Sequence, residues 1–241
     1  MKTRFFLLCI VLLSLLTLNA FASVDVRSIF ITTNEGLANN SVRYLFQDSK
    51  GFVWMGTLDG LSRYDGHSFV TFRPGIGDEI SLADHHVKVI TEDRNGFLWI
   101  FTSPEIFSCY DLKRDCFVDY TGCGEYKQEY KRKLETSTGD IWLWHNEKNG
   151  CRKITYKDGH FSSVIFNRKN GKLFSDSVNY VHEDEQGSVW ICTQAGLVWV
   201  AGNQTQLFKK ELSFVAAVAY AKKNFFLASN GQIYEKTRGK G

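Results

Sequence analysis

One short pattern recurs along this chain at nearly constant spacing. Three copies read Asp-x-x-Gly-x-φ-Trp, where φ is an apolar residue, and another copy keeps the glycine and the tryptophan but begins with Thr136. The tryptophans of successive copies are 45, 43 and 48 residues apart. A repeat of this length indicates an architecture in which one supersecondary unit is stacked on the next. The residues of the pattern are Asp48, Gly51 and Trp54, then Asp93, Gly96 and Trp99, then Gly139 and Trp142, and finally Asp184, Gly187 and Trp190.

Each repeat has the pattern of short strands and tight turns. In the first copy we expect strands at 42–47, 52–57, 61–64 and 68–72, because β-forming runs are separated there by turn residues. The aspartate and glycine of the repeat suit the first and fourth positions of a type I turn. The tryptophan then lies in the middle of a strand, where its ring is large enough to fill the space between neighbouring units. Four antiparallel strands per repeat predict a β-propeller blade.

The predicted fold class is therefore all-β, a β-propeller of four-stranded antiparallel blades with about four to five blades present. After residue 22 no stretch keeps a 3.6-residue apolar period, so the helix content should be low. We interpret the propeller as incomplete and open, which would leave strand edges and blade faces exposed. A ring closed by a strand at 28–32 is the alternative. The predicted blades cover approximately 40–73, 86–121, 131–167 and 178–210, with a partial blade at 215–236.

Residues 1–22 have the composition of an export signal. The basic residues Lys2 and Arg4 precede an apolar run that ends at Leu18, and small residues stand at Ala22 and two positions before it. The apolar run is shorter than the about 20 residues that cross a bilayer. We expect cleavage after Ala22, with an uncleaved anchor as the alternative, and an exported mature chain of residues 23–241.

Net charge and cysteine content argue against several classes of function. The formal net charge is +3, and removal of Lys2 and Arg4 would leave about +1, so nothing favours binding of the mature segment to nucleic acid or directly to a membrane. Five cysteines remain after residue 22, and none are spaced as Cys-x-x-Cys, which argues against a metal or redox centre. Cys109 and Cys116 flank an expected hairpin turn, where a disulfide is one option and free thiols are the preferred one.

From Asn40 to Gly66 the sequence resembles the two-component-regulator propeller repeat. The repeats that begin at Asp93 and Asp184 resemble it as well, and the likeness extends over roughly residues 28–234. The third unit departs from the family pattern because it lacks the turn aspartate. A fifth, degenerate unit keeps neither the aspartate nor the tryptophan, so those two blades are expected to be irregular or to carry specialised loops.

This resemblance implies the periplasmic sensor region of hybrid two-component histidine kinases from Bacteroides-type bacteria. Such a propeller is expected to sense breakdown products of complex glycans, with an oligosaccharide as ligand. Its partners would be the remaining propeller, a β-sandwich and the kinase of a longer receptor, and a dimer would form through that receptor. The family implies more blades than 241 residues supply, so we expect an N-terminal fragment of a larger sensor. The chain has no kinase motif, which leaves it sensing but not phosphotransfer.

No residue pattern indicates catalysis. We assign no catalytic, cofactor-binding or metal-binding residue, since His85 and His86 would point to opposite faces of a strand and no nucleophile elbow or zinc motif occurs. Tyr110, Trp144 and Trp199 are aromatic residues that the repeat does not explain, so they are candidates for stacking on a sugar, although packing in the blade cores is favoured for each. Two other functions stay open: an exported propeller enzyme that acts on glycans, and an interaction scaffold without a small ligand.

Overall fold

The structure is a computed structural model that describes residues 28–75, 80–122, 124–125, 128–208 and 211–237. The predicted signal peptide at 1–22 and its cleavage after Ala22 lie outside the described residues. Contacts divide the chain into residues 1–31 and a unit of residues 32–241, which holds every described strand. Within the described residues, no helix is both long enough and apolar enough to cross a membrane.

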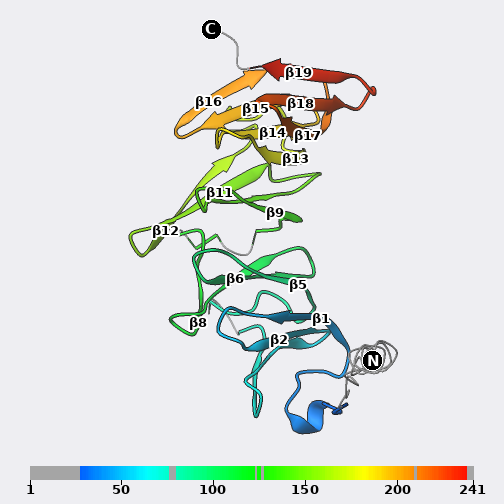
Figure 1. Cartoon of the computed structure of the whole chain (residues 1–241), viewed down its shortest axis with the longest axis vertical. Helices are drawn as coiled ribbons and strands as arrows, with labels where there is room; N and C mark the ends of the chain where they lie inside the picture. Colours follow the sequence, from blue (N-terminus) through cyan, green and yellow to red (C-terminus); the bar gives the residue numbers. More distant parts are fainter. Residues whose placement is uncertain (1–27, 76–79, 123, 126–127, 209–210, 238–241) are drawn as a thin grey trace, which may run out of the picture. The chain divides into compact units, whose positions relative to one another are not determined.

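Five antiparallel sheets follow one another along the described residues (Figure 1). Sheet 1 contains β1 (Val42–Gln47), β2 (Val53–Thr57), β3 (Gly60–Tyr64) and β4 (Phe69–Phe72). Sheet 2 contains β5 (Val87–Glu92), β6 (Phe97–Thr102), β7 (Phe107–Asp111) and β8 (Cys116–Val118). Sheet 3 contains β9 (Arg132–Glu135), β10 (Ile141–Trp144), β11 (Cys151–Lys157) and β12 (His160–Phe166). Sheet 4 contains β13 (Val178–Glu183), β14 (Val189–Thr193), β15 (Gly196–Ala201) and β16 (Gln204–Phe208). Sheet 5 contains β17 (Phe214–Tyr220), β18 (Lys223–Ala228) and β19 (Ile233–Thr237).

In each sheet the strands are hydrogen-bonded in chain order, so each strand pairs with the one before and the one after it. This antiparallel meander is the topology of a propeller blade, and it confirms the predicted fold class. Helix among the described residues is confined to one 3-10 turn at Thr33–Glu35. That turn begins with a capping box, in which Thr32 accepts a hydrogen bond from the Asn34 N–H and Glu35 accepts one from the Thr32 N–H.

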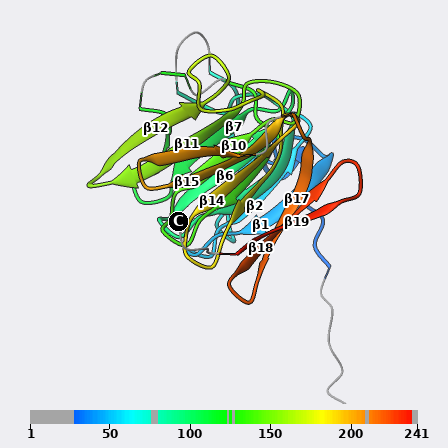
Figure 2. The same cartoon turned by 90° about the horizontal axis from the view of Figure 1, so that it is seen from above.

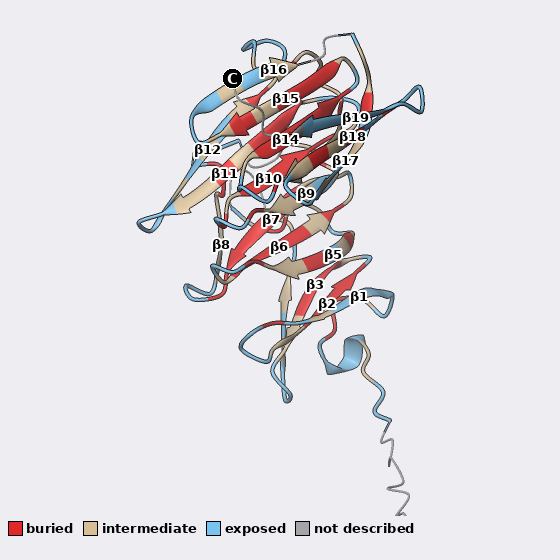
Figure 3. Cartoon of the chain, turned by 45° about the horizontal axis from the view of Figure 1, so that its top comes forward, coloured by how far each residue is buried: buried red, intermediate tan, exposed pale blue. Residues whose placement is uncertain are grey.

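The hydrophobic core lies between successive sheets, and Figure 3 shows the buried residues concentrated on the inner strands of each. Trp54 of sheet 1 shares a cluster with Ile90 and Leu98 of sheet 2, and Trp99 of sheet 2 shares one with Leu143 of sheet 3. The next two clusters contain Trp142 with residues of sheet 4, and Trp190 with residues of sheet 5. Each repeat tryptophan therefore packs against the sheet that follows it in the chain.

The outer faces of sheets 1 and 5 are open, and the sheets overlap when the unit is viewed along the stack (Figure 2). Leu45 on β1 is 63% exposed, whereas Ile90 and Val181, which hold the same register position in sheets 2 and 4, are fully buried. Val218 on β17 is 56% exposed. Residues 28–32 form no strand, so the alternative of a ring closed by that segment is not seen.

Candidate functional site

The buried aspartate of each complete repeat organises its own hairpin turn. Asp48 accepts hydrogen bonds from the N–H groups of Lys50 (2.9 Å) and Phe52 (3.0 Å) through one carboxylate oxygen, and from Trp54 Nε1 (2.7 Å) through the other. Asp93 and Asp184 make the same three contacts in their repeats. A carboxylate can be buried only when hydrogen bonds replace its water. The hydrogen bonds of these three acids therefore hold the turn and the tryptophan of their own repeats.

The third repeat lacks this arrangement. Thr136 holds the turn through its hydroxyl, which accepts a hydrogen bond from the Asp140 N–H at 3.0 Å. The hydroxyl does not reach the indole, and Trp142 Nε1 is buried without a hydrogen-bond partner among the described residues. The buried Nε1 of Trp144 likewise has no hydrogen-bond partner among the described residues. Both rings lie in the cluster between sheets 3 and 4.

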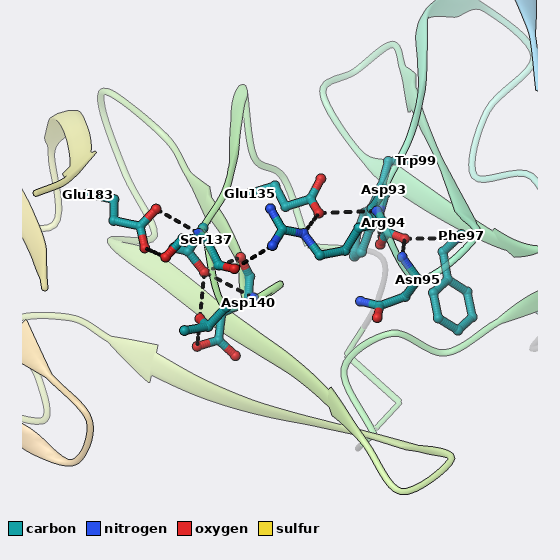
Figure 4. A network of polar contacts seen from close by, with 11 residues as sticks. Asp93, Arg94, Asn95, Phe97, Trp99, Glu135, Ser137, Asp140 and Glu183 are labelled. Carbon is teal, nitrogen blue, oxygen red and sulfur yellow. Dashed lines mark hydrogen bonds and ion pairs between the residues drawn. The ribbon is translucent and has the colours of Figure 1, made fainter. Parts of the chain in front are cut away.

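A second set of contacts joins each repeat turn to the next sheet, and we call it the inter-sheet clasp (Figure 4). The residue after the turn aspartate, or after Thr136, bonds a glutamate at the end of the next sheet's first strand. Ser137 donates to Glu183 through its N–H (2.7 Å) and its hydroxyl (2.6 Å), and Arg94 donates to Glu135 through its N–H (3.1 Å) and Nε (2.7 Å). Ser49 and Glu92 form the matching pair between sheets 1 and 2.

In the clasp between sheets 4 and 5 the donor and the acceptor are exchanged: the repeat turn supplies the carboxylate and the next sheet supplies the N–H. Here the residue after the turn aspartate is Glu185, which accepts a hydrogen bond from the Lys222 N–H at 3.1 Å. Sequence reasoning missed the clasps, although a signal was present, since Glu92, Glu135 and Glu183 each stand directly before the first residue of a repeat.

The structure places two of the three ligand candidates in the core. Tyr110 is 1% exposed, contacts the Trp54 ring edge-on with centroids 5.1 Å apart, and donates its hydroxyl to Asp115 at 2.8 Å. Burial, reinforced by that hydrogen bond, raises the pKa of the Tyr110 hydroxyl well above its ordinary value. Trp144 is 4% exposed. Trp199 differs from both, because it is half-buried and lines a groove.

The groove that Trp199 lines lies between sheets 4 and 5, and we call it the Trp199 groove. Its volume is about 190 Å³. Sheet 4 supplies the turn after β13 together with β14, β15 and β16, and sheet 5 supplies the hairpin turn before β18 together with β18 and β19. Its walls therefore combine three aromatic rings with amide, ammonium and carboxylate groups. The lining residues are Asp184, Gln186, Ser188, Trp190, Trp199, Gln206, Phe208, Lys222, Asn224 and Lys236.

A second groove, of about 430 Å³, lies between sheets 2 and 3, and we call it the Phe161 groove. Phe97, Tyr156 and Phe161 pack on one another along it with ring centroids 4.7 to 4.8 Å apart. Asp119 also lines it. Burial acts to raise the pKa of Asp119, but hydrogen bonds from Thr121 and from backbone N–H groups outweigh burial and lower it. The three aromatic rings of this groove therefore pack against one another.

The described cysteines are free thiols. The β7–β8 register pairs Cys109 with Val118 and Cys116 with Asp111, so the two cysteines are not opposite each other and the disulfide option is not realised. Burial raises the pKa of the Cys109 thiol well above its ordinary value. Among the described residues no group of three or more His, Cys, Asp or Glu side chains is placed to hold a metal ion.

Comparison with known proteins supplies the family of the first repeat. Residues 36–59 match the family model described as "Two component regulator propeller". This segment is similar to the two component regulator propeller repeat. The resemblance noted for the segment from Asn40 to Gly66 is thereby confirmed, since the matched residues include the first turn and its tryptophan.

Relatives of this repeat occur in longer proteins. Over 52 residues, which are 22% of this chain and 4% of the other, the sequence is 40% identical to Histidine kinase P4 of Formosa agariphila. The extracellular domain of a hybrid two component system from B. thetaiotaomicron aligns with 87% of this chain and 35% of its own length, at 17% identity and a TM-score of 0.42. PorZ of the Porphyromonas gingivalis type-IX secretion system aligns with 80% of this chain and 32% of its own length, at 14% identity and a TM-score of 0.47.

Proposed function

We propose that this chain is the ligand-sensing propeller region of an exported receptor that signals to a histidine kinase. The observation that carries the proposal is the two component regulator propeller repeat at residues 36–59, together with the local similarity to a histidine kinase. The export signal predicted at 1–22 supports a location outside the cytoplasm, in the periplasm. The kinase, a β-sandwich and further propeller blades would belong to the complete receptor, and dimerisation would occur through it.

The ligand that we propose is an oligosaccharide released from a complex glycan. Aromatic residues that line a groove beside amide groups suit a sugar, because the ring faces take up the apolar side of a pyranose and the amides bond its hydroxyl groups. The Trp199 groove offers this combination on the described surface.

An exported propeller enzyme is the second candidate function, and the repeat carboxylates argue against it. Hydrolysis or elimination needs a free acid or base beside the substrate. Asp48, Asp93 and Asp184 are buried, and each accepts three or more hydrogen bonds that hold its own turn and indole, which supports a structural role over a catalytic one. A scaffold without a small ligand is the third candidate.

A panel of oligosaccharides prepared from defined glycans tests these functions against one another. The purified chain is heated with each oligosaccharide while its unfolding is followed, and the sugars are then examined for cleavage. The sensor function predicts a rise in Tm with one class of oligosaccharide and no cleavage, because a ligand that binds only the folded state stabilises it. Cleavage of any sugar would favour the enzyme, and an unchanged Tm across the panel would favour the scaffold.

A further inference from the structure

We propose that the Trp199 groove is a binding site for one acidic sugar unit, a uronic acid or a sulfated sugar, at the end of a longer saccharide. This inference rests on the proposed function, because it names the site and the ligand class of the same propeller. Its starting point is the position of Trp199 in the repeat, where other sheets place a different kind of side chain.

The strand registers define which residues correspond to Trp199. Trp199 pairs with the repeat tryptophan Trp190 across β14 and β15. In the same way, Arg63 pairs with Trp54 in sheet 1, Cys109 with Trp99 in sheet 2, and Lys153 with Trp142 in sheet 3. These residues point into the corresponding spaces between sheets, so their contacts show how each space is normally filled.

Between sheets 1 and 2 the space is filled by Arg63. Its guanidinium lies over the rings of Phe52 (4.8 Å to the centroid) and Trp54 (5.6 Å), and it donates hydrogen bonds to the Tyr110 hydroxyl (3.3 Å) and to the Asp115 carboxylate. The charge is thus stacked on one sheet and paired with the other.

The next two spaces are also filled by paired or stacked cations. Between sheets 2 and 3, Lys133 extends over the Trp99 ring, with Nζ 5.7 Å from the centroid. In sheet 3, Lys153 Nζ lies 2.8 Å from an Asp140 carboxylate oxygen. A cation that is held over the tryptophan or beside a carboxylate is therefore the common feature of the first three repeats.

The groove between sheets 4 and 5 also holds a cation over a ring, Lys236 over Phe208. At the register position of Arg63, Cys109 and Lys153, however, sheet 4 carries Trp199, whose ring lines an open groove. Asp184 cannot serve a ligand, since its two oxygens already accept four hydrogen bonds, the fourth from Asn224 Nδ2 at 3.3 Å. Asn224 is 6% exposed, and its Oδ1 has no hydrogen-bond partner among the described residues. A buried amide oxygen without a partner is unfavourable, so this residue of the groove wall offers an acceptor to a hydroxyl or N–H donor.

The charges of the groove favour an anionic ligand. Lys222 and Lys236 line it, while its one lining carboxylate, that of Asp184, is enclosed by its own four donors. Lys236 Nζ lies 5.3 Å from the centroid of the Phe208 ring, which holds the ammonium at the wall beside the aromatic surface. A carboxylate or sulfate on the sugar would pair with these ammonium groups, while the Asn224 oxygen accepts from a sugar hydroxyl.

The size of the groove limits how much of the ligand it holds. Sites for drug-sized ligands are usually about 300–1,000 Å³, and the 190 Å³ found here is smaller. The groove therefore suits one sugar ring, with the rest of the saccharide outside.

Calorimetric titration of the whole chain tests this assignment with four probes: a uronic acid oligosaccharide, a sulfated oligosaccharide, a neutral oligosaccharide of matched length, and inorganic sulfate. We expect one acidic oligosaccharide to bind at least about tenfold more tightly than the neutral one, and inorganic sulfate to bind far more weakly than the sulfated sugar. Added salt should weaken the acidic preference, because the lysines are near the surface.

Variants locate the site. Trp199→Ala should weaken binding by about tenfold or more, and Lys236→Gln should remove the preference for the acidic sugar. A further groove variant, Gln206→Ala, has Gln204→Ala on the same strand as its matched control. The matched control for Lys236→Gln is Lys223→Gln. Neither Gln204 nor Lys223 lines the groove. Trp199→Phe provides a milder second variant if urea unfolding shows that Trp199→Ala has lost its fold.

Each outcome bears on a different statement. If the neutral sugar binds as tightly as the acidic one, or if sulfate alone binds as tightly as the sulfated sugar, the acidic-sugar assignment is overturned. If an oligosaccharide binds equally well to the Trp199 and Lys236 variants but loses affinity in Phe161→Ala, this groove is the wrong site while the proposed function stands. If no oligosaccharide of the broad panel binds, the proposed function itself fails.

Discussion

The aspartate and the tryptophan of each complete repeat are six residues apart in sequence and bonded in space. The sequence predicts the turn, because aspartate and glycine at its ends have intrinsic preferences for those positions. The indole bond from Trp54 to Asp48 could not be predicted in the same way, since it depends on the hairpin folding back so that the carboxylate meets the side chain of the returning strand. The sequence did show that the third repeat has Thr136 in place of the aspartate. In the structure, Trp142 Nε1 consequently has no hydrogen-bond partner among the described residues.

This difference between repeats predicts a difference between two tryptophan variants. Trp99→Phe removes an indole that is bonded to Asp93 at 2.7 Å and leaves a buried carboxylate oxygen short of a donor. Trp142→Phe removes an indole whose N–H has no partner. The lost ring volume is the same, so we expect Trp99→Phe to lower the free energy of unfolding by about 1–3 kcal/mol more than Trp142→Phe. Urea unfolding of both variants checks this, and equal losses would contradict the assigned role of the aspartate.

A half-buried histidine, His182, gives the chain a pH-dependent contribution to stability. Burial lowers the pKa of His182 below its ordinary value of 6.5, and the neighbouring charges of Asp184 and Glu183 oppose this only in part. The unfolded chain therefore takes up this proton at a higher pH than the folded chain does. The contribution of His182 is fully present above about pH 6.5 and is lost as the pH falls toward the folded pKa.

We expect the stability difference between wild type and His182→Gln to shrink or reverse in favour of the variant as the pH is lowered from about 7 to about 5. Urea midpoints at each pH measure it, and subtraction of the variant removes the contribution of the other titrating groups. A difference that does not vary with pH would show that His182 keeps the same pKa in both states.

At the scale of the strands, local pattern was sufficient for much of the fold. The strands expected at 42–47, 52–57, 61–64 and 68–72 are each found within one residue at both ends, because Gly and Asp turns delimit them. The segment after β8 is different. Asp119 accepts hydrogen bonds from the N–H groups of Thr121 and Gly124, and Ser163 on β12 donates its hydroxyl to the Thr121 carbonyl at 2.8 Å. That segment is placed by sheet 3, which no local pattern could indicate.

Close approach of successive sheets depends on Gly56 in the middle of β2. A Cβ added there would lie 2.6 Å from Val87 Cγ1 of β5, which is shorter than any real contact. Gly56→Ala should therefore lower the free energy of unfolding by about 1–3 kcal/mol through overpacking. Val87→Ala costs stability by itself, but in the double variant the two losses should be less than additive, because the cavity accepts the new methyl group. Strict additivity in urea unfolding would argue that the two positions do not meet.

At the scale of the whole unit, sequence periodicity located the repeats but not the groove between two of them. Trp199 could be singled out as an aromatic residue outside the repeat, but its neighbours in the groove come from positions up to 52 residues apart in the sequence, from Asp184 to Lys236. Asn224 and Lys236 belong to the degenerate fifth unit, where the pattern that guided the other assignments is lost. Their alignment with Trp199 follows from the packing of sheet 5 on sheet 4.

The open faces of the end sheets predict how the chain behaves alone in solution. Val218, Tyr220 and Ile233 are 56%, 73% and 70% exposed on sheet 5, and Leu45 is 63% exposed on sheet 1. Apolar faces that a neighbouring sheet would normally cover tend to associate. We expect the chain to form larger species as its concentration rises, and Val218→Lys or Leu45→Lys to shift it toward the monomer in sedimentation velocity. Because these side chains are already exposed, the variants should change the free energy of unfolding by no more than about 0.5 kcal/mol.

Val164→Lys is the matched control, since Val164 is 42% exposed on β12 of sheet 3, away from both end sheets. A chain that stays monomeric at all concentrations, or variants that associate as wild type does, would contradict the role assigned to these faces.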